Sequence, residues 1–206
     1  MNKEQLSDKV WNLIKQQKNG TIFSINDFYH LGNVNTIKSI LFRLESDGKI
    51  TRLIDGLYTI PKFSELLQEK SYPSVDQVAN KLADKFSWTI CPSENHALNL
   101  IGLSTQVPNK YVFVSDGPYR TYEYRGREII FKHTSNRFIT EYSRNYSLMI
   151  QSIKALGKDN IHENDIKRMA TFSKQYIDDD IIDKGKKLPA WIQEVLKKIA
   201  KEVKVL

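Results

Sequence analysis

The sequence predicts an α+β protein of two domains, and three observations lead to this prediction. Apolar residues recur at helical spacing in the first fifty positions and again towards the C-terminus. Between these regions, short runs rich in Val, Ile, Phe and Tyr are separated by Gly, Pro and Asp, as is typical of strands. A Pro-bounded stretch at 63–73, with a short helical segment, is expected to link a domain at 1–62 to one at 74–206.

The first domain is expected to open with four elements. They are a helix at 3–17, a short strand at 21–23, a short helix ending near Leu31 and a longer helix at 34–46. Ser24 or Asn26 is expected to cap the short helix, and Gly32 to close it. Asn33 is a good cap for the longer helix. Its inward stripe is expected to hold Val34, Ile37, Leu41 and Leu44.

The run "RLIDGLYTI", residues 52–60, predicts a β-hairpin. Asp55 and Gly56 both tolerate the positive φ of a type I′ turn. Because a two-stranded hairpin by itself is marginal in water, this one must pack on the preceding helices. Helix, short helix, glycine turn, longer helix and hairpin, in this order, are typical of a winged helix-turn-helix domain.

In such a domain, the helix at 34–46 reads DNA and the hairpin is the wing. The residues expected to bind DNA are Asn33, Asn35, Thr36, Lys38, Ser39, Arg43, Lys49, Arg52 and Gly56, with Phe42 on the same outward face. Amide, hydroxyl and guanidinium groups can hydrogen-bond base edges or phosphates, and lysine attracts phosphates. The alternative interpretations are an ordinary solvated surface and a protein-binding module.

The charge of the chain is uneven. The net charge of +7 divides into +3 for residues 1–62, −1 for 63–183 and +5 for 184–206. Basic ends favour a polyanionic partner such as nucleic acid, although lysines can also form a solvated face.

The chain has no long apolar run and no apolar leader segment, and Cys91 is its one cysteine. These features predict a cytoplasmic protein without a disulfide framework.

The second domain is expected to mix helices with a small sheet. Helices are expected at 75–85 and after a cap at Ser93, strands at 86–90, 110–115, 120–124 and 127–133, and further helices at 137–155, 163–176 and 188–204. Six aromatic residues alternate along the strands: Tyr111, Phe113, Tyr119, Tyr122, Tyr124 and Phe131. Core packing is the favoured interpretation of this alternation, and stacking on unpaired bases is the other one.

The C-terminal helix is amphipathic and basic, with Pro189 at its start. Its apolar stripe holds Trp191, Val195, Leu196, Ile199 and Val203. The helix either docks on its own domain, binds a partner protein, or contacts nucleic acid or a membrane. The residues expected at a partner interface are Trp191, Leu196, Lys197, Lys198 and Lys201.

No catalytic residue, metal site or cofactor is expected. The four histidines (His30, His96, His133 and His162) form no metal-binding pair, and no phosphate-binding glycine loop occurs. Ser93 and His96 share a helix face, which indicates a cap and an ordinary helix residue rather than a nucleophile and its base. The acidic run Asp178–Asp180 with Asp183 is interpreted as a helix start, with a divalent-metal site as the alternative.

Two stretches resemble antitoxins of the AbiEi type, an abortive-infection family of type IV toxin–antitoxin systems. In "HALNLIGLSTQVPNKYVFVSDG" (96–117), the matching pieces are Ala97-Leu98, Gly102-Leu103, Thr105 and Pro108, followed by an apolar strand. "GKITRLIDGLYTIPKF" (48–63) is similar to the end of that family's winged helix. The resemblance spans roughly residues 1–135 and rests on order and context.

The resemblance implies a bacterial, cytoplasmic repressor that binds inverted repeats in its own promoter, as a dimer or as two copies. It also implies a C-terminal domain that counteracts a nucleotidyltransferase-like toxin encoded next to it. Three alternatives remain at this point: a winged-helix regulator without a toxin, an antitoxin that binds only protein, and a metal-dependent nucleic-acid enzyme using residues 178–183.

Overall fold

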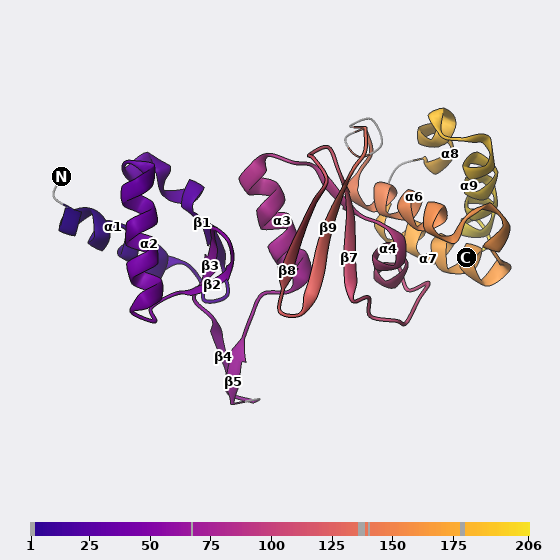
Figure 1. The fold of residues 1–206 in the computed structure, drawn as a ribbon. Helices are drawn as coiled ribbons and strands as arrows, with labels where there is room; N and C mark the ends of the chain where they lie inside the picture. Colours follow the sequence, from indigo (N-terminus) through magenta and orange to yellow (C-terminus); the bar gives the residue numbers. More distant parts are fainter. Residues whose placement is uncertain (1–2, 67, 136–138, 140, 178–179) are drawn as a thin grey trace. The chain divides into compact units, whose positions relative to one another are not determined.

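The computed structural model describes residues 3–66, 68–135, 139, 141–177 and 180–206. The chain divides into an N-terminal unit, 1–87 with 123–125, and a C-terminal unit, 88–122 with 126–206. Both units combine helices with strands (Figure 1). The prediction of a mixed α+β protein is therefore confirmed.

The N-terminal unit begins with the predicted series of elements. They are α1 (Lys3–Gln16), β1 (Ile22–Ser24), the 3₁₀ helix η1 (Ile25–Leu31), α2 (Val34–Ser46), β2 (Thr51–Ile54) and β3 (Leu57–Thr59). The strands form one antiparallel sheet in the order β1-β3-β2. The β2–β3 hairpin is thus hydrogen-bonded to β1 through β3. The two units do not share this sheet.

One apolar cluster holds these elements together. Its members from α2 are Ile37, Ile40, Leu41 and Leu44, and Phe23 and Phe28 meet edge to face within it at 5.9 Å. The predicted inward stripe of α2 was wrong at one position, because Val34 is 40% exposed while Ile40 is buried. Val34 is the first residue of the helix and lies at the edge of the core, and Ile40, about one turn after Ile37, completes the stripe.

The hairpin turn differs from the predicted type I′ turn. Gly56 has a φ of 75°, but Asp55 is not among the residues with positive φ. A type I′ turn needs two positive φ values, whereas a single one at the second central residue is typical of type II. A bulge between Arg52 and Ile54 shifts the register of the two strands. Such a bulge increases the local twist of a strand pair.

The predicted linker is a second hairpin rather than a helical segment. β4 (Lys62–Ser64) pairs antiparallel with β5 (Glu69–Ser71). Phe63 and Leu66 are 60% and 92% exposed, so no buried face was there to stabilise a helix. Pairing of the two strands satisfies the backbone groups instead.

Helix α3 (Val75–Phe86) starts at a capping box of Ser74 and Gln77, with the predicted apolar face buried. It belongs to the N-terminal unit, whereas the sequence placed it in the second domain. The predicted strand at 86–90 is also displaced, because the helix continues to Phe86 and ends on the left-handed Ser87. The strand that follows is β6 (Ile90–Pro92), at the edge of its sheet, where a proline is tolerated.

The predicted strands are β7 (Lys110–Ser115) and β9 (Arg127–His133) in the C-terminal unit, and β8 (Arg120–Tyr124), whose last two residues are grouped with the N-terminal unit. The sheet order is β6-β7-β9-β8, with β7 and β9 parallel. Phe113 and Phe131 are fully buried and 5.8 Å apart, which confirms core packing for the central aromatic residues. Tyr119 is the exception, at 64% exposed.

Helices form the rest of this unit. They are α4 (Glu94–Leu100), α6 (Arg144–Leu156), η2 (Lys158–Asn160), α7 (Glu163–Tyr176), α8 (Ile181–Lys184), η3 (Gly185–Lys187) and α9 (Ala190–Val203). The helix predicted at 137–155 begins at Arg144, where Ser143 caps it; positions 136–138 and 140 lie outside the described residues. Helix α9 packs on α7 and on the core of its own unit (Figure 1). Docking on its own domain is thus confirmed for the apolar stripe of the C-terminal helix.

Candidate nucleic-acid interface

Helix α2 presents a polar face that its N-terminal cap holds in position. The Asn33 side chain accepts a hydrogen bond from the Asn35 backbone N–H at 2.8 Å. The Ser39 hydroxyl donates to the Asn35 carbonyl at 2.9 Å, which leaves its oxygen free to accept. Asn33 therefore acts first as the helix cap, and the following residues carry the exposed chemistry.

Four of the predicted residues meet in one hollow of about 200 Å³. Its lining consists of Asn35, Thr36, Ser39, Ile40 and Arg43. Lys38 and Phe42 lie on the same helix and are exposed, Phe42 by 66%. Among the described residues, neither Lys38 nor Arg43 forms an ion pair within the protein. This face can thus offer donors, acceptors and uncompensated positive charge to a partner.

Two residues predicted for the wing, unlike Lys38 and Arg43, form ion pairs among the residues that the structure describes. Arg52 forms an ion pair with Asp55 at 3.0 Å, and Lys49 forms one with Asp47 at 3.3 Å. Lys49 also lies 5.9 Å from the ring centre of Trp11. An ion pair offsets much of the attraction that each cation would exert on a phosphate, so we expect both residues to contribute less than Arg43.

Lys85 of α3 also reaches the hairpin, which the sequence did not predict. Its ammonium donates to the Asp55 carbonyl at 3.3 Å. Burial lowers the pKa of Lys85, the charge of Asp55 partly opposes this effect, and the charge of Lys38 lowers the pKa further. No local pattern joins Lys85 to a turn thirty positions earlier, so reasoning from the sequence could not find this contact.

The residues predicted at a partner interface on α9 separate into two groups. Lys197, Lys198 and Lys201 are exposed, and Trp191 is half-buried against the core. Leu196 is 1% exposed, so its assignment to a partner interface was wrong. It lies on the stripe that fixes α9 to its own unit.

Residues with enzyme-like chemistry have structural roles. Asp180 caps α8 by accepting from the backbone N–H groups of Ile182 and Asp183, as expected of a helix start; Asp178 and Asp179 lie outside the described residues. Ser93 precedes α4 without the predicted side-chain cap, and its hydroxyl points to the Val112 carbonyl at 3.4 Å. His96 is buried against the rings of Tyr111 and Phe113.

Three further observations concern metal ions, thiol chemistry and membrane spans. Within the described part of the chain, no three His, Cys, Asp or Glu side chains gather closely enough to bind a metal ion. Burial raises the pKa of the Cys91 thiol to about 12, which disfavours the nucleophilic thiolate at neutral pH. No described helix has both the length and the apolar character needed to cross a membrane.

Comparison with known families gives one match over most of the chain. Residues 9–181 match the model of a family of unknown function, DUF6088. The chain belongs to the DUF6088 family. The matched region includes the polar face of α2, the hairpin, α3 and the four-stranded sheet, whereas α9 lies outside it. No curated protein matches the chain.

Proposed function

We propose that the protein is a DNA-binding transcriptional repressor whose residues 1–62 form a winged helix-turn-helix domain. The observation that carries the proposal is the exposed face of α2, where Asn35, Ser39 and Arg43 line one hollow. In this arrangement, α2 enters the major groove and the 55–56 turn lies over the neighbouring backbone.

The chemistry of this face suits nucleic acid. Arg43 can form two hydrogen bonds with a guanine edge, and Asn35 can form two with an adenine edge. Phe42, 66% exposed, offers apolar contact to a thymine methyl group. The net charge of +3 over residues 1–62 favours the approach of a polyanion. A repressor of this kind acts by occupying promoter DNA, and an operator of inverted repeats would take a dimer or two copies.

Replacing Arg43 by alanine is expected to weaken binding to the duplex upstream of the protein's own coding sequence by about 1–3 kcal/mol. The reason is loss of a guanidinium that has no ion-pair partner among the described residues and lines the hollow. Gel shifts measure the effect, and circular dichroism checks the fold. Lys70→Ala, which removes an exposed charge from β5, is the matched control.

The Arg52→Ala variant should lose less affinity than the Arg43→Ala variant, because Asp55 already compensates the charge of Arg52. Gel shifts that are unchanged in both variants would count against the DNA-binding proposal.

The second candidate function is antitoxin activity by the C-terminal unit, as the AbiEi resemblance implies. The observation that favours a protein partner is a hollow of about 510 Å³ bordered by α4 and α7. It is lined by Leu100, Arg168, Phe172 and Tyr176, among others, and Tyr176 is 51% exposed. Aromatic and arginine side chains are enriched at the centres of protein interfaces.

This second proposal predicts a stable complex with a nucleotidyltransferase-like protein encoded next to this one. The two proteins should elute together from a sizing column, and Tyr176→Ala should weaken the complex by about 2 kcal/mol if this aromatic residue is an anchor. Lys174→Ala, also on α7 and exposed, is the control. Separate elution of the wild-type proteins would exclude neutralisation by stable contact.

A further inference from the structure

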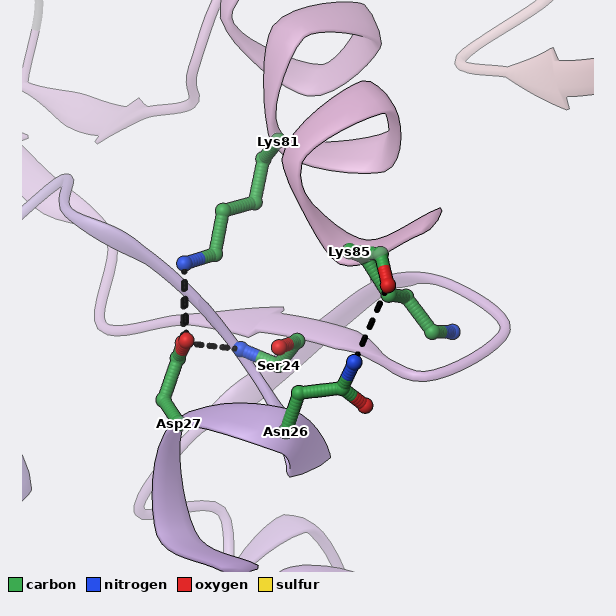
Figure 2. Close-up of polar contacts among 5 residues, drawn as sticks. All are labelled: Ser24, Asn26, Asp27, Lys81 and Lys85. Carbon is green, nitrogen blue, oxygen red and sulfur yellow. Dashed lines mark hydrogen bonds and ion pairs between the residues drawn. The ribbon is translucent and has the colours of Figure 1, made fainter. Parts of the chain in front are cut away.

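Helix α3 is attached by two polar contacts to the segment that follows β1 (Figure 2). The Lys81 ammonium lies 2.9 Å from the Asp27 carboxylate, which also accepts from the Ser24 backbone N–H at 2.7 Å. The Asn26 side-chain amide donates to the Lys85 carbonyl at 3.0 Å. The last turn of α3 is therefore fixed to the start of η1.

The last turn of α3 also reaches the β2–β3 hairpin. Ser24 pairs with Leu57 in the sheet, and Leu57 directly follows the 55–56 turn. The side chain of Lys85 extends away from the amide that binds its carbonyl (Figure 2), and its ammonium donates to the Asp55 carbonyl at 3.3 Å. The backbone and the side chain of one residue thus connect η1 to the hairpin turn.

Gly56 leaves the space that this ammonium occupies. A β-carbon built on Gly56 would lie 2.5 Å from the Lys85 ammonium nitrogen but 3.6 Å from the Lys85 Cε, which is an ordinary van der Waals distance. Because the ammonium is the end of a flexible side chain, a methyl group at this position would displace it at little cost in packing. The displacement would break the hydrogen bond to the Asp55 carbonyl.

The hairpin itself has few means of fixing its turn. β2 and β3 are only four and three residues long, and a bulge interrupts their register. The Asp55 carboxylate pairs with Arg52 at 3.0 Å, but this ion pair lies within the hairpin and does not tie the turn to another element. The hydrogen bond from Lys85, in contrast, joins the turn to a helix that is anchored elsewhere.

We propose that Lys85 is a positioning residue for DNA binding, because it holds the 55–56 turn where the wing meets the DNA backbone. This inference rests on the proposed DNA-binding function and extends the DNA-binding module from residues 1–62 to α3. Lys85 acts through the turn and does not itself contact a phosphate. A wing that is ordered before binding loses less conformational entropy on binding, which raises the affinity.

Two variants remove the contact by different means. Lys85→Met keeps most of the side chain without the ammonium, and Gly56→Ala keeps the ammonium but displaces it. Each is expected to weaken binding of the full-length protein to the duplex upstream of its coding sequence by about two- to tenfold, the worth of one hydrogen bond. Gly48→Ala controls for backbone strain, since Gly48 has a φ of 69° and no neighbour within 4 Å of an added β-carbon.

The double variant tests whether the two changes act on the same contact. Methionine lacks the terminal nitrogen of lysine, so after Lys85→Met the methyl group of Gly56→Ala meets at most an ordinary van der Waals contact. The double variant should therefore bind about as well as the weaker of the two single variants. A loss equal to the product of the two fold-changes would mean independent roles and would overturn the proposal.

The salt dependence of binding separates positioning from direct contact. Loss of a phosphate contact lowers the slope of log K against log salt by about one, whereas loss of a positioning residue should leave the slope unchanged. A fall of about one for Lys85→Met, with Gly56→Ala binding like the control variant, would assign the ammonium to a phosphate and reject the positioning role.

A measurement without DNA tests the contact itself. In the free protein, the NMR order parameters of the backbone amides of residues 55–57 should fall from about 0.85 towards about 0.6 in the Lys85→Met and Gly56→Ala variants. The amides of α2 should keep their values, and Gly48→Ala should resemble the wild type at 55–57. Unchanged order parameters at 55–57 in both variants would show that Lys85 does not hold the turn.

The outcomes also distinguish this inference from the proposed function. If Arg43→Ala weakens duplex binding, but the Lys85 and Gly56 variants bind like the control variant, the positioning role is wrong and the DNA-binding function stands. If the wild type binds no duplex at all, the proposed function fails, and the order parameters alone then decide whether Lys85 holds the turn.

Discussion

Replacing Leu41 by alanine is expected to lower the free energy of unfolding of the N-terminal unit by about 2–5 kcal/mol. Leu41 is 1% exposed, and its cluster joins α1, η1, α2 and the hairpin. Alanine would leave a cavity that neighbours on several elements cannot fill without moving. The loss is a large fraction of the stability of a small unit, and DNA binding should weaken with it.

Hydrogen exchange measured peptide by peptide locates the effect. Backbone amides of α1, α2 and β1–β3 should lose protection, while those of α6, α7 and α9, which belong to another core, should keep theirs. Phe42→Ala on the same helix is the control, because its exposed side chain should contribute no more than about 0.5 kcal/mol. Equal loss of protection in α6, α7 and α9 would contradict the division into separate cores.

The Gly117→Ala substitution is expected to destabilise the C-terminal unit by about 1–3 kcal/mol through a steric clash. A β-carbon at this position would lie 2.4 Å from two ring atoms of Trp88. The ring has little freedom to move, because it packs edge to face on the buried Phe131 at 5.5 Å. The backbone is also held, since the Gly117 N–H donates to the Ser115 hydroxyl at 3.0 Å.

Urea denaturation measures the loss, and a changed tryptophan emission of the native protein should accompany it. The Gly126→Ala variant separates clash from backbone strain, because Gly126 has a φ of 73° and no neighbour within 4 Å of an added β-carbon. It should cost about 1–2 kcal/mol without altering the native emission. An unchanged midpoint and emission for Gly117→Ala would show that the Trp88 ring yields freely.

Several elements could be predicted from the sequence because local patterns determine them. The bounds of β7, β8, β9 and α7 agree with the prediction, since Gly and Pro turns flank the strands and the helical periodicity of α7 lies within its own segment. The outward face of α2 was also predictable. Once the stripe of Ile37, Leu41 and Leu44 faces the core, helix geometry directs Asn35, Ser39 and Arg43 outward.

The errors occurred where contacts outside the segment itself decide the structure. Periodicity alone identified the apolar stripe of α9 but could not tell whether its own core or a partner covers Leu196. The stretch around Phe63 has an ordinary helical composition, yet strand pairing with Lys70 determines its conformation. In the first case the helix is the same and only the surface that covers it was open, whereas in the second two conformations satisfy the local pattern and strand pairing selects one of them.

The sequence by itself determined the kinds of elements, their order and the polar face of α2, because capping, turn chemistry and periodicity act between residues a few positions apart. Only the tertiary structure decided that α3 joins the N-terminal unit and brings Lys85 to the hairpin turn. The contacts that fix α3, Lys81 with Asp27 and Asn26 with the Lys85 carbonyl, span more than fifty positions. Periodicity marks the apolar face of α3, but which surface buries that face and which carboxylate compensates Lys81 depend on distant residues and leave no local pattern in the sequence.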